Sequence, residues 1–381
     1  MDLRVAQLIE TLGTGGAEKL AVEIARARAA SGDDSHLIIL RRAGDLAAKV
    51  PDSVSLHVLG LDPGNPLSLA GAVGRLTSLC RHLELDALQT HLPLANFFGL
   101  TLAWRGVVRV FPTVHNNREF SYGNAANPVR RRLRRWAYRR LTVHGAAMIA
   151  VSDAVKAAMA AELGLQGRDL NRLIVVPNGV VIPEPTGSQD RQRRRREFGV
   201  EGEEVLIVGV GRLSEQKNFG DLLMALASLG PGAPAWRCVI AGGGPQEMQL
   251  RDQAGQLGLD SRLTLAGRID DVNRLLAAGD IFCLPSLWEG LPLALLEAMA
   301  AGLPVAAYGI DGVKDVITDG RQGLLVPTGD HAGLGRVLER LMADGDLRRT
   351  LGREARQLVK ERHGMERVNA HLGRIYAGET E

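Results

Sequence analysis

Short apolar stretches alternate along almost the whole chain with longer stretches in which apolar residues recur every three or four positions. The short stretches have the length and composition of buried strands, and the longer ones have the period of amphipathic helices. The pattern predicts two sets of strands. The first set lies at residues 5–9, 36–40, 87–90, 108–114, 147–151 and 173–176. The second set lies at residues 205–210, 237–241, 263–266, 281–284, 305–308 and 323–326.

Strands that alternate with helices are typical of parallel sheets built from βαβ units. Three prolines and a polar, basic run near residues 183–192 separate the two sets, and the arginines at 191–196 are expected to begin a solvated linker helix. We therefore predict an α/β fold of two Rossmann-like, doubly wound parallel-sheet domains that face a cleft, with ligands at the carboxyl ends of the strands. The predicted domains span residues 1–183 and 192–362, and residues 363–381 form a C-terminal helix that crosses back to the first domain.

With 381 residues, 45% of them hydrophobic and 23% charged, the chain has the composition of a globular protein of two domains. Its net charge is only +3, but just six of its 46 basic residues are lysines. The cysteines, Cys80, Cys238 and Cys283, are far apart, which suits a reducing compartment and argues against disulfides or a zinc cluster. No uncharged apolar run has the length of a membrane span, and the first residues do not resemble a signal peptide. We expect a cytoplasmic protein that can attach peripherally to the inner face of the cytoplasmic membrane.

The first predicted strand is followed by the glycine-rich turn TLGTGGAEKL, which opens the first helix. Gly13, Gly15 and Gly16 permit a tight turn and a close backbone approach, and a helix N-terminus favours an anion. A dinucleotide fingerprint would need a third glycine where Glu18 stands, and an acidic residue where the second strand ends in two arginines. NAD is therefore disfavoured. NADP stays a weaker alternative through the arginines, and a turn without a ligand is another.

A second loop, VGRLSEQKNF, follows the first strand of the second set and carries Arg212 and Lys217. An arginine can hold two phosphate oxygens at once and a lysine adds a compact positive charge, so the pair suits a diphosphate. The pair could neutralise a leaving diphosphate without a metal, and no Asp-x-Asp pair that would hold a metal stands at a strand end. An ordinary exposed loop is the alternative. Two further glycine turns, at residues 241–248 and 266–272, follow the next two strands.

Glu289 and Glu297 lie in the almost wholly apolar stretch WEGLPLALLEAMAAGLPV. Pro292 is a good first residue for a helix, so we expect Glu289 before the helix and Glu297 inside it. Eight helical residues span about 12 Å, whereas the two carboxylates of a retaining glycosidase are about 5 Å apart. Hydrogen bonds to two separate sets of ligand hydroxyls fit this spacing better, with the free backbone N–H groups in the stretch 290–293 facing a phosphate or sugar oxygen. Capping or pairing with arginines is the structural alternative.

Together these stretches resemble the family 4 glycosyltransferases, retaining enzymes with the GT-B fold of two Rossmann-like domains. The resemblance covers nearly the whole chain, and its motifs occur in the family's order. They are GGAE at 15–18, VS at 151–152, PNGV at 177–180, VGRLSEQKNF near 210, GGGP at 242–245, E-x7-E at 289–297 and EAMAAGLPV at 297–305. Two departures concern the particular sugar rather than the class: IDGVKDV stands where the family usually has G-G-x-x-E, and Val181 stands where aspartate is common.

The resemblance assigns roles to residues in several of these motifs. Arg212 and Lys217 look like the pair on the donor diphosphate, Glu297 like the residue on the nucleotide ribose, and Glu289 like one on the donor sugar hydroxyls. The backbone amides of residues 290–292 would face the sugar and phosphate, and Arg268 with its neighbour would lie beside the base. The implied donor-binding residues are Gly15, Gly16, Arg212, Lys217, Arg268, Ile269, Glu289, Gly290, Leu291, Pro292 and Glu297.

The resemblance also suggests a histidine at the reacting centre. His115 follows a first-domain strand in PTVHNNRE, where the family often has a histidine that faces the sugar, and it is the catalytic candidate. His91, at the end of the preceding strand, is its competitor. We assign His91 and Asn116 to the acceptor site, which the segment after Phe120 is expected to shape.

The segment NPVRRRLRRWAYRRL carries seven arginines between positions 130 and 140. Asn127 can cap a helix there and Pro128 can begin it. A basic amphipathic helix with an aromatic anchor is typical of a membrane-surface element that attracts anionic lipid or a phosphate-bearing acceptor. A solvated arginine-rich helix is the alternative, and nucleic-acid binding is disfavoured because no recognised module is present. The predicted membrane-surface residues are Arg131, Arg134, Arg135 and Trp136.

The resemblance therefore implies a retaining, metal-independent hexosyltransferase. It would move a sugar from a UDP- or GDP-sugar to a lipid-linked or glycan acceptor, in cell-surface polysaccharide or glycolipid synthesis. No cofactor is expected, because the nucleotide sugar is a substrate, and the departing phosphate itself would stabilise the oxocarbenium-like charge. Two alternatives stay open. A nucleotide-sugar epimerase on the same fold would need catalytic carboxylates in both domains, with Glu18 and Glu119 as the first-domain candidates, and the third reading is a non-catalytic membrane-surface module.

Overall fold

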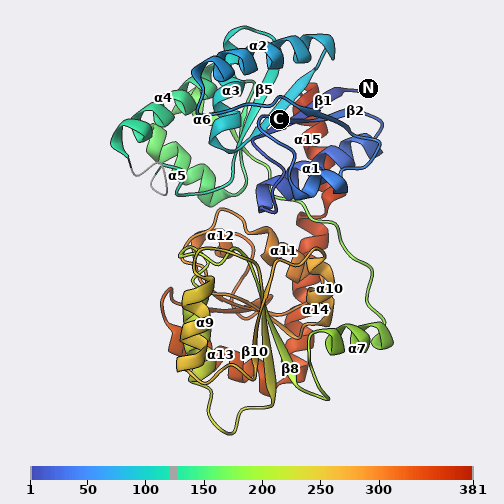
Figure 1. Ribbon diagram of the computed structural model, residues 1–381, viewed down its shortest axis with the longest axis vertical. Coiled ribbons are helices and arrows are strands. Elements are labelled where there is room, and N and C mark those ends of the chain that lie inside the picture. The colour runs from blue at the N-terminus through green and yellow to red at the C-terminus, as the bar shows by residue number, and fades with distance from the viewer. Residues whose placement is uncertain (1, 121–126, 380–381) are drawn as a thin grey trace. The chain divides into compact units, whose positions relative to one another are not determined.

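The structure, a computed structural model, describes residues 2–120 and 127–379. Contacts divide the chain into two compact units (Figure 1). The first unit comprises Met1–Gly179 together with Met365–Glu381, and the second comprises Val180–Gly364. The C-terminal segment thus belongs to the first unit, although the chain reaches it only after the second unit is complete. Each unit is an α/β domain with one parallel sheet.

The first unit contains a seven-stranded parallel sheet of order β3-β2-β1-β4-β5-β6-β7. Its strands are β1 (Arg4–Ile9), β2 (Asp34–Ile39), β3 (Ser55–Val58), β4 (Ala87–His91), β5 (Arg109–Val114), β6 (Met148–Ala150) and β7 (Leu173–Val175). Its helices are α1 (Gly16–Ala30), the 3-10 helix η1 (Asp45–Lys49), α2 (Pro66–His82), α3 (Leu92–Trp104), α4 (Pro128–His144), α5 (Asp153–Leu163), α6 (Gly167–Asn171) and α15 (Met365–Ala377). The strand order reverses between β1 and β4, which makes a topological switch point.

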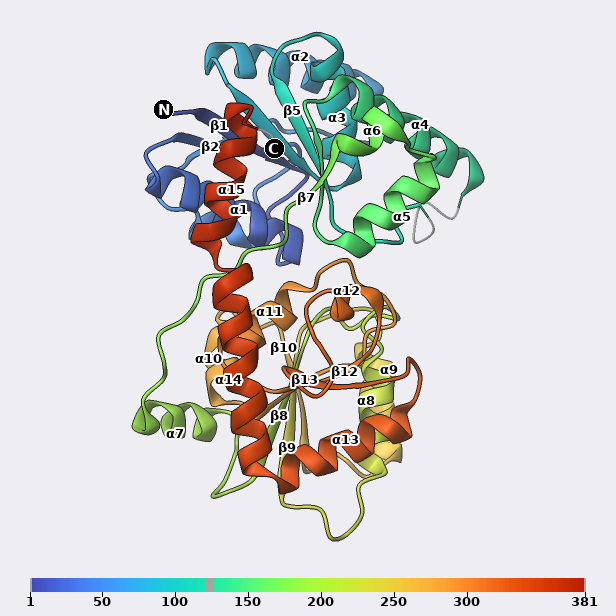
Figure 2. The same cartoon turned by 180° about the vertical axis from the view of Figure 1, so that it is seen from behind.

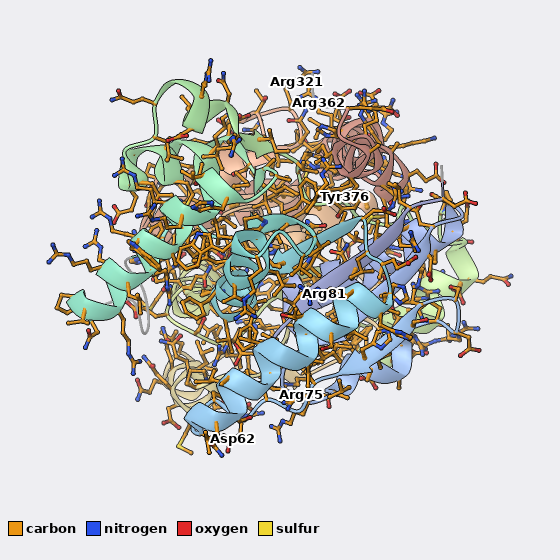
Figure 3. All side chains as sticks on the ribbon, turned by 90° about the horizontal axis from the view of Figure 1, so that it is seen from above. Asp62, Arg75, Arg81, Arg321, Arg362 and Tyr376 are labelled. Atoms are coloured by element: carbon orange, nitrogen blue, oxygen red, sulfur yellow. The ribbon has the colours of Figure 1, made fainter. Side chains whose placement is uncertain are left out.

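Alternate residues of the central strands face opposite sides of this sheet, as the period of a strand requires. Leu8 and Leu88 pack against α2 and α3, whereas Ile9 and Leu37 pack against α1. Helix α15 lies alongside α1 (Figure 2). Figure 3 shows α2 on the outside of the unit, where Arg75 Nε donates to the Leu59 carbonyl over 3.1 Å. Both faces of the sheet are therefore covered by helices.

The second unit repeats the plan with a six-stranded parallel sheet of order β10-β9-β8-β11-β12-β13. Its strands are β8 (Val205–Val210), β9 (Trp236–Ala241), β10 (Leu263–Gly267), β11 (Ile281–Leu284), β12 (Val305–Tyr308) and β13 (Gly323–Val326). Its helices are α7 (Ser188–Glu197), α8 (Phe219–Ala227), α9 (Glu247–Gln256), α10 (Val272–Ala278), α11 (Leu293–Ala300), α12 (Asp311–Lys314), α13 (His331–Ala343) and α14 (Gly345–Arg362). Here the strand order reverses between β8 and β11.

The sequence pattern predicted these strands to within two residues at either end, except β3. That edge strand is mostly exposed and has no buried apolar run, so it gave no signal. A helix is present where a solvated linker helix was expected at 191–196, but it is solvated on one side only. Helix α7 packs against α10, where Arg195 is 8% exposed and its Nη1 lies 2.7 Å from Asp280 Oδ2. Arg191 and Arg195 are therefore structural partners of Asp280, whereas Arg193 and Arg196 are exposed.

Candidate functional site

The candidate site of the second unit lies at the switch point of its sheet, where β8 and β11 are neighbours. Strand β8 runs into the loop that carries Arg212 and Lys217. Strand β11 runs into the loop that carries Glu289, and α11 with Glu297 follows. Parallel strands end at the same edge of a sheet, so these four residues belong to one edge.

Lys217 and Glu289 form an ion pair at this edge. Lys217 Nζ lies 2.5 Å from Glu289 Oε1, and the two side chains are 15% and 8% exposed. Gln216 braces the same loop, because its Nε2 donates to Glu289 Oε2 over 3.2 Å and to the Trp288 carbonyl over 3.0 Å. A pair with so little access to water is screened by salt less than a surface pair. The structure thus joins a cation and a carboxylate that the sequence had assigned to different parts of a donor.

Arg212 lies in the same loop but is exposed, and no carboxylate pairs with it within the described part of the chain. The aliphatic part of the Lys217 side chain packs over Gly211, where a Cβ atom would come 3.0 Å from Lys217 Cε. Asn218 follows in the left-handed conformation, with φ of 49°, and its side chain donates to Asp221 Oδ2 over 2.7 Å. The loop therefore holds Lys217 in one place and presents Arg212 at the surface.

The glycine turn after β9 packs directly on this loop. A Cβ atom on Gly242 would lie 1.8 Å from the Gly211 carbonyl oxygen, and one on Gly244 would lie 2.2 Å from the Leu213 carbonyl oxygen. A backbone hydrogen bond of 3.0 Å from Gly211 N to Ala241 O joins the same segments. Because no side chain fits between the two backbones, these glycines are required by packing alone.

The loop between β11 and α11 is buried at Gly290, Leu291 and Pro292. Pro292 is the N-cap residue of α11 rather than its first helical residue. Helix α12 abuts the loop, because a Cβ atom on Gly312 would lie 2.4 Å from the Gly290 carbonyl oxygen. Gly312 belongs to the stretch IDGVKDV, so this departure from the family pattern forms part of the wall of the site. The sequence had given no role to it.

The other predicted donor residues of this unit are spread around the same edge. Glu297 is half-buried on α11 and makes interactions within the unit. Arg268 and Ile269 follow β10, with Arg268 exposed and Ile269 half-buried. The Arg268 side chain lies beside Gly243, 3.7 Å from the place of a Cβ atom there. Strand ends β8, β9, β10 and β11 thus all contribute to this edge.

In the first unit, Gly15 is the N-cap residue of α1 and Gly16 begins it. The carboxylate of Glu18 folds back over this end, since Glu18 Oε2 lies 2.3 Å from where a Cβ atom on Gly15 would be. Burial, opposed by a backbone hydrogen bond and reinforced by Glu10, raises the pKa of Glu18. The N-terminus of α1, which we expected to bind the donor, is thus occupied by a carboxylate of the chain itself. The partial positive charge of a helix N-terminus stabilises a carboxylate as it would a phosphate.

His91 and His115 are joined at the carboxyl ends of β4 and β5. His91 Nδ1 lies 3.1 Å from His115 Nε2, and His91 Nε2 lies 2.8 Å from Gln7 Oε1. The two rings stack with centroids 5.3 Å apart. Burial lowers the pKa of His115 to about 4, and burial together with His115 lowers the pKa of His91 well below its usual value. Both imidazoles are therefore neutral at pH 7.

This geometry corrects the assignment of His91 to the acceptor. His91 is 0% exposed and both of its ring nitrogens are used inside the unit, so its ring has no nitrogen left for a ligand. Asn116 is half-buried, and its side-chain oxygen accepts from Arg118 N over 2.8 Å, which closes a local turn. His115 is half-buried at the strand end, where a ligand can reach it.

The loop after β5 is anchored by a buried network. Tyr138 OH donates to Glu119 Oε1 over 2.9 Å, and Asn96 Nδ2 donates to Tyr138 OH over 2.9 Å. Arg134 Nη1 donates to the Glu119 carbonyl over 2.6 Å. Burial raises the pKa of Glu119 to about 7, although Arg134 and Tyr138 oppose the shift. Of the segment expected to shape the acceptor site after Phe120, residues 121–126 lie outside the described residues.

Helix α4 begins as predicted, because Asn127 Oδ1 accepts from Val129 N over 3.0 Å and from Arg130 N over 3.2 Å. Three of the predicted membrane-surface residues are ion-paired. Arg131 and Arg135 lie 2.6 and 3.6 Å from Glu162 Oε1, and Arg134 lies 3.7 Å from Glu119 Oε1.

The exposed apolar side chains of α4 continue onto α3. Val129, Leu133 and Trp136 are 75%, 55% and 42% exposed, and the ring of Trp136 lies 5.5 Å from that of Trp104 on α3. The guanidinium of Arg140 lies over Trp136, 6.0 Å from the ring centroid. A surface hollow of about 470 Å³ lies beside this patch, lined by Pro128, Arg131, Arg132 and Arg135. The exposed arginines of α4 are Arg130, Arg132, Arg135, Arg139 and Arg140.

Among residues 2–120 and 127–379, no three His, Cys, Asp or Glu side chains are arranged to hold a metal ion. Within those ranges no helix combines the length and the apolar character that crossing a membrane requires. Cys80, Cys238 and Cys283 are buried free thiols, and burial raises the pKa of Cys80 to about 12.

Sequence reasoning missed several polar residues of these edges. Ser286 follows β11, and its hydroxyl is fully buried without a hydrogen-bond partner in the described part of the chain. Gln216 supports Glu289, and Gln7 supports His91. A signal was present in two of these cases, since Gln7 stands inside the apolar strand RVAQLI and Ser286 inside the apolar run IFCLPSLW. A polar side chain in a buried strand needs a partner, which marks it for attention.

Two sequence families match the chain, one on each unit. The family described as "Glycosyltransferase Family 4" matches residues 14–182, and the family described as "Glycosyl transferases group 1" matches residues 190–358. Together they cover most of the chain.

Among curated relatives, a 2-deoxystreptamine glucosyltransferase of Streptomyces kanamyceticus is 29% identical over 301 residues, which is 76% of either chain. An N-acetyl-alpha-D-glucosaminyl L-malate synthase of Bacillus anthracis is 29% identical over 188 residues, so the match spans about half of that relative, 49% of either chain. The crystal structure of HepE of Anabaena in complex with UDP and glucose has a TM-score of 0.85 at 19% identity, and covers 99% of this chain and 100% of that one. At this identity the structural comparison concerns the fold, which is the two-domain fold described above.

Proposed function

Because the chain belongs to the family 4 glycosyltransferases, we propose that it moves a sugar from a nucleoside diphosphate sugar to a glycan or lipid-linked acceptor, with retention of anomeric configuration. The observation that carries the proposal is the Lys217–Glu289 ion pair beside the exposed Arg212, at the β8–β11 switch point. Two cations and a carboxylate at one strand edge suit a ligand that combines a diphosphate with sugar hydroxyls.

In the proposed complex the diphosphate lies against Arg212 and Lys217, and the sugar hydroxyls lie against Glu289. Lys217 then exchanges part of its contact with Glu289 for phosphate oxygens, and the freed carboxylate oxygen accepts from a sugar hydroxyl. Glu297 holds the ribose, and Arg268 with Ile269 lies beside the base. UDP and GDP are the candidate nucleotides. Support for UDP comes from the solved structures of the same fold that contain UDP or UDP-glucose.

His115 is the proposed residue at the reacting centre. Its neutral ring at pH 7 can accept a hydrogen bond from a sugar or acceptor hydroxyl without adding a positive charge beside a developing oxocarbenium ion. Arg212 and Lys217 stabilise the leaving diphosphate, so the proposed reaction needs no metal. Activity measured with EDTA should then equal activity measured without it.

The membrane contact is proposed for a patch that differs from the one expected from the sequence. Val129, Leu133 and Trp136 of α4 are its exposed apolar side chains, together with Trp104 of α3. Arg131, Arg134 and Arg135 pair with Glu162 and Glu119. The positive charge that would attract anionic lipid is therefore assigned to the arginines of α4 that pair with no carboxylate in the described part of the chain, Arg130, Arg132, Arg139 and Arg140. Such a basic, aromatic surface suits the headgroup region of an anionic membrane.

The test is release of nucleoside diphosphate from a panel of UDP- and GDP-sugars, with water or a glycan fragment as acceptor. The wild type should turn over one nucleotide series, and NMR of the product should show the anomer of the donor. Glu289→Gln should reduce turnover by about a hundredfold, because the ligand loses a charged acceptor. Glu201→Gln, an exposed carboxylate of the same unit, is the matched control and should leave turnover unchanged. Inversion of the anomer, or an active Glu289→Gln, would contradict the proposal.

A further inference from the structure

Three neighbouring strands of the first unit carry polar side chains toward the same face of the sheet. Gln7 on β1 is in register with Gln89 on β4, and His91 on β4 is in register with Thr113 on β5. Residues two apart in a strand point to the same side, so Gln89 with His91, and Thr113 with His115, extend this row. The row is opposite to the face packed by Leu8, Leu88 and Val110. Polar side chains in the centre of a sheet require an internal explanation.

That explanation is a continuous chain of hydrogen bonds that ends at His115. Gln7 Oε1 lies 2.8 Å from His91 Nε2, and His91 Nδ1 lies 3.1 Å from His115 Nε2. Gln7 Nε2 donates over 3.4 Å to the hydroxyl of Tyr376 on α15, and that hydroxyl donates to Gln89 Oε1. Gln89 Nε2 then donates over 2.7 Å to Thr113 Oγ1. Tyr376, labelled in Figure 3, reaches the row from the C-terminal helix.

The direction of the chain fixes the protons. An amide oxygen only accepts, so Gln7 Oε1 requires the hydrogen of His91 on Nε2. A neutral imidazole carries one hydrogen, which leaves His91 Nδ1 as an acceptor and requires His115 to donate from Nε2. His115 Nδ1 is then the ring nitrogen with a free lone pair. The orientation of the Gln7 amide depends in turn on Tyr376, because the hydroxyl that donates to Gln89 can only accept from Gln7 Nε2.

We propose that Tyr376, Gln7 and His91 form a relay that holds His115 as the Nε2–H tautomer, so that the C-terminal helix positions the reactive histidine of the first unit. The relay is buried throughout, with His91 at 0%, Gln7 and Tyr376 at 1%, and Gln89 and Thr113 at 2% exposure. Water therefore does not compete for its hydrogen bonds. The Tyr376 ring is fixed separately, by Phe111 at a centroid distance of 5.3 Å and by Arg28 at 5.8 Å.

The relay rests on the proposed function in one respect, namely that His115 accepts a hydrogen bond from a reacting hydroxyl through Nδ1. The tautomer with the hydrogen on Nδ1 would present a donor at that place and lose the interaction. Tyr376, Gln7 and His91 touch no ligand in this scheme, so they are positioning residues. Their loss should lower kcat more than it raises KM for the donor.

The decisive variant is Tyr376→Phe, which removes one hydroxyl and keeps the ring that packs on Phe111. Ring ¹⁵N spectra of histidine-labelled protein, with His115 assigned by its loss in His115→Gln, should show His115 as the Nε2–H tautomer in the wild type and as a mixture in Tyr376→Phe. Donor turnover should show kcat lower by about tenfold to a hundredfold at similar KM. Gln7→Leu, which removes the acceptor of His91, should shift the tautomer in the same way and serves if Tyr376→Phe does not fold.

Arg367→Ala is the matched control on the same helix. Arg367 is exposed on α15 and takes no part in the relay, so the tautomer and kcat should be unchanged. An Nδ1–H tautomer in the wild type, or unaltered spectra in Tyr376→Phe, would overturn the relay. An altered tautomer with unaltered kcat would overturn its role in positioning. Absence of turnover with every donor in the wild type would contradict the proposed function instead, and the spectra would still decide on the relay.

Discussion

The two units share the order of their first six strands, to which the first unit adds β7, but they differ at the edges where their switch points lie. In the second unit this edge is charged, with the Lys217–Glu289 pair and an exposed Arg212. Glycines there allow the backbones of two loops to pack in direct contact. In the first unit the ends of β4 and β5 are neutral at this edge, with two stacked imidazoles backed by buried amides. The same topology therefore supports two chemistries. A charged edge suits the binding of a diphosphate, whereas a neutral, hydrogen-bonded edge suits the positioning of reacting hydroxyls.

The largest loss of stability is expected where the loops after β8 and β9 pack backbone against backbone at the charged edge. Gly242→Ala would place a Cβ atom 1.8 Å from the Gly211 carbonyl oxygen, at a φ of +145°. We expect a loss of about 3 kcal/mol or more in the free energy of unfolding, measured by denaturant titration. Gly230→Ala is the control, because no atom lies within 4 Å of that Cβ position. Equal stability of Gly242→Ala and the wild type would show that the two loops are not held in contact.

Substitutions in the Lys217–Glu289 ion pair should have the next largest effect, and they separate nucleotide binding from the stability of the fold. Lys217→Ala should leave the Glu289 carboxylate without its cation and destabilise the protein by about 1–3 kcal/mol, while Glu289→Gln in the same chain should restore part of that loss. Nucleotide binding should stay weak in both variants, because the diphosphate has lost its cation. Chemical unfolding and calorimetric titration measure the two quantities. Recovery of nucleotide binding in the double variant would show that Lys217 serves only the fold.

A smaller effect concerns the dependence of stability on pH. Two groups of the first unit, His115 and Glu119, should change the free energy of unfolding in opposite directions as pH rises. His115, with its pKa lowered to about 4, binds a proton in the unfolded chain before it does in the folded one. Stability is therefore lost as pH falls from 6.5 towards 4. Thermal unfolding of His115→Gln should show a shallower decline in Tm over this range. A decline as steep as that of the wild type would mean that His115 is not the titrating group.

Glu119 has its pKa raised to about 7, so the folded state binds the extra proton and stability is lost as pH rises from 4.5 through 7. Glu119→Gln should therefore raise Tm relative to the wild type by a few degrees at pH 8, and by less at pH 5. The same difference in Tm at both pH values would indicate that the carboxyl group does not titrate in this range.

The smallest change in stability is expected at the patch on α3 and α4. Replacing Arg130, Arg132 and Arg139 by glutamine should change the free energy of unfolding by less than about 0.5 kcal/mol, since all three are exposed. Binding to vesicles that contain anionic lipid should weaken by about 1 kcal/mol per arginine, measured by co-sedimentation. The control removes three exposed arginines of the second unit, Arg321, Arg336 and Arg349. Equal loss of binding in both variants would indicate attraction by net charge alone.

Local patterns were enough to predict most of the fold, because buried parallel strands are short apolar runs between helical segments. They missed β3, whose residues are mostly exposed. They also identified the loops of Lys217 and Glu289, but the ion pair itself joins residues 72 positions apart and depends on strand order. Likewise Tyr376 meets Gln7 across 369 positions, and only the packing of α15 on the first unit brings them together. Burial of His91 could not be inferred from its place at a strand end.

The central claim is that the charged edge of the second unit holds a nucleoside diphosphate. Thermal unfolding should be measured with UDP and with GDP for the wild type, Lys217→Ala and Glu297→Gln. A ligand that binds only the folded state stabilises it by about 2.7 kcal/mol at a hundred times its Kd. The account predicts that one nucleotide raises the Tm of the wild type and that neither variant responds at the same concentration. Equal shifts in all three proteins, or none with either nucleotide in the wild type, would contradict it.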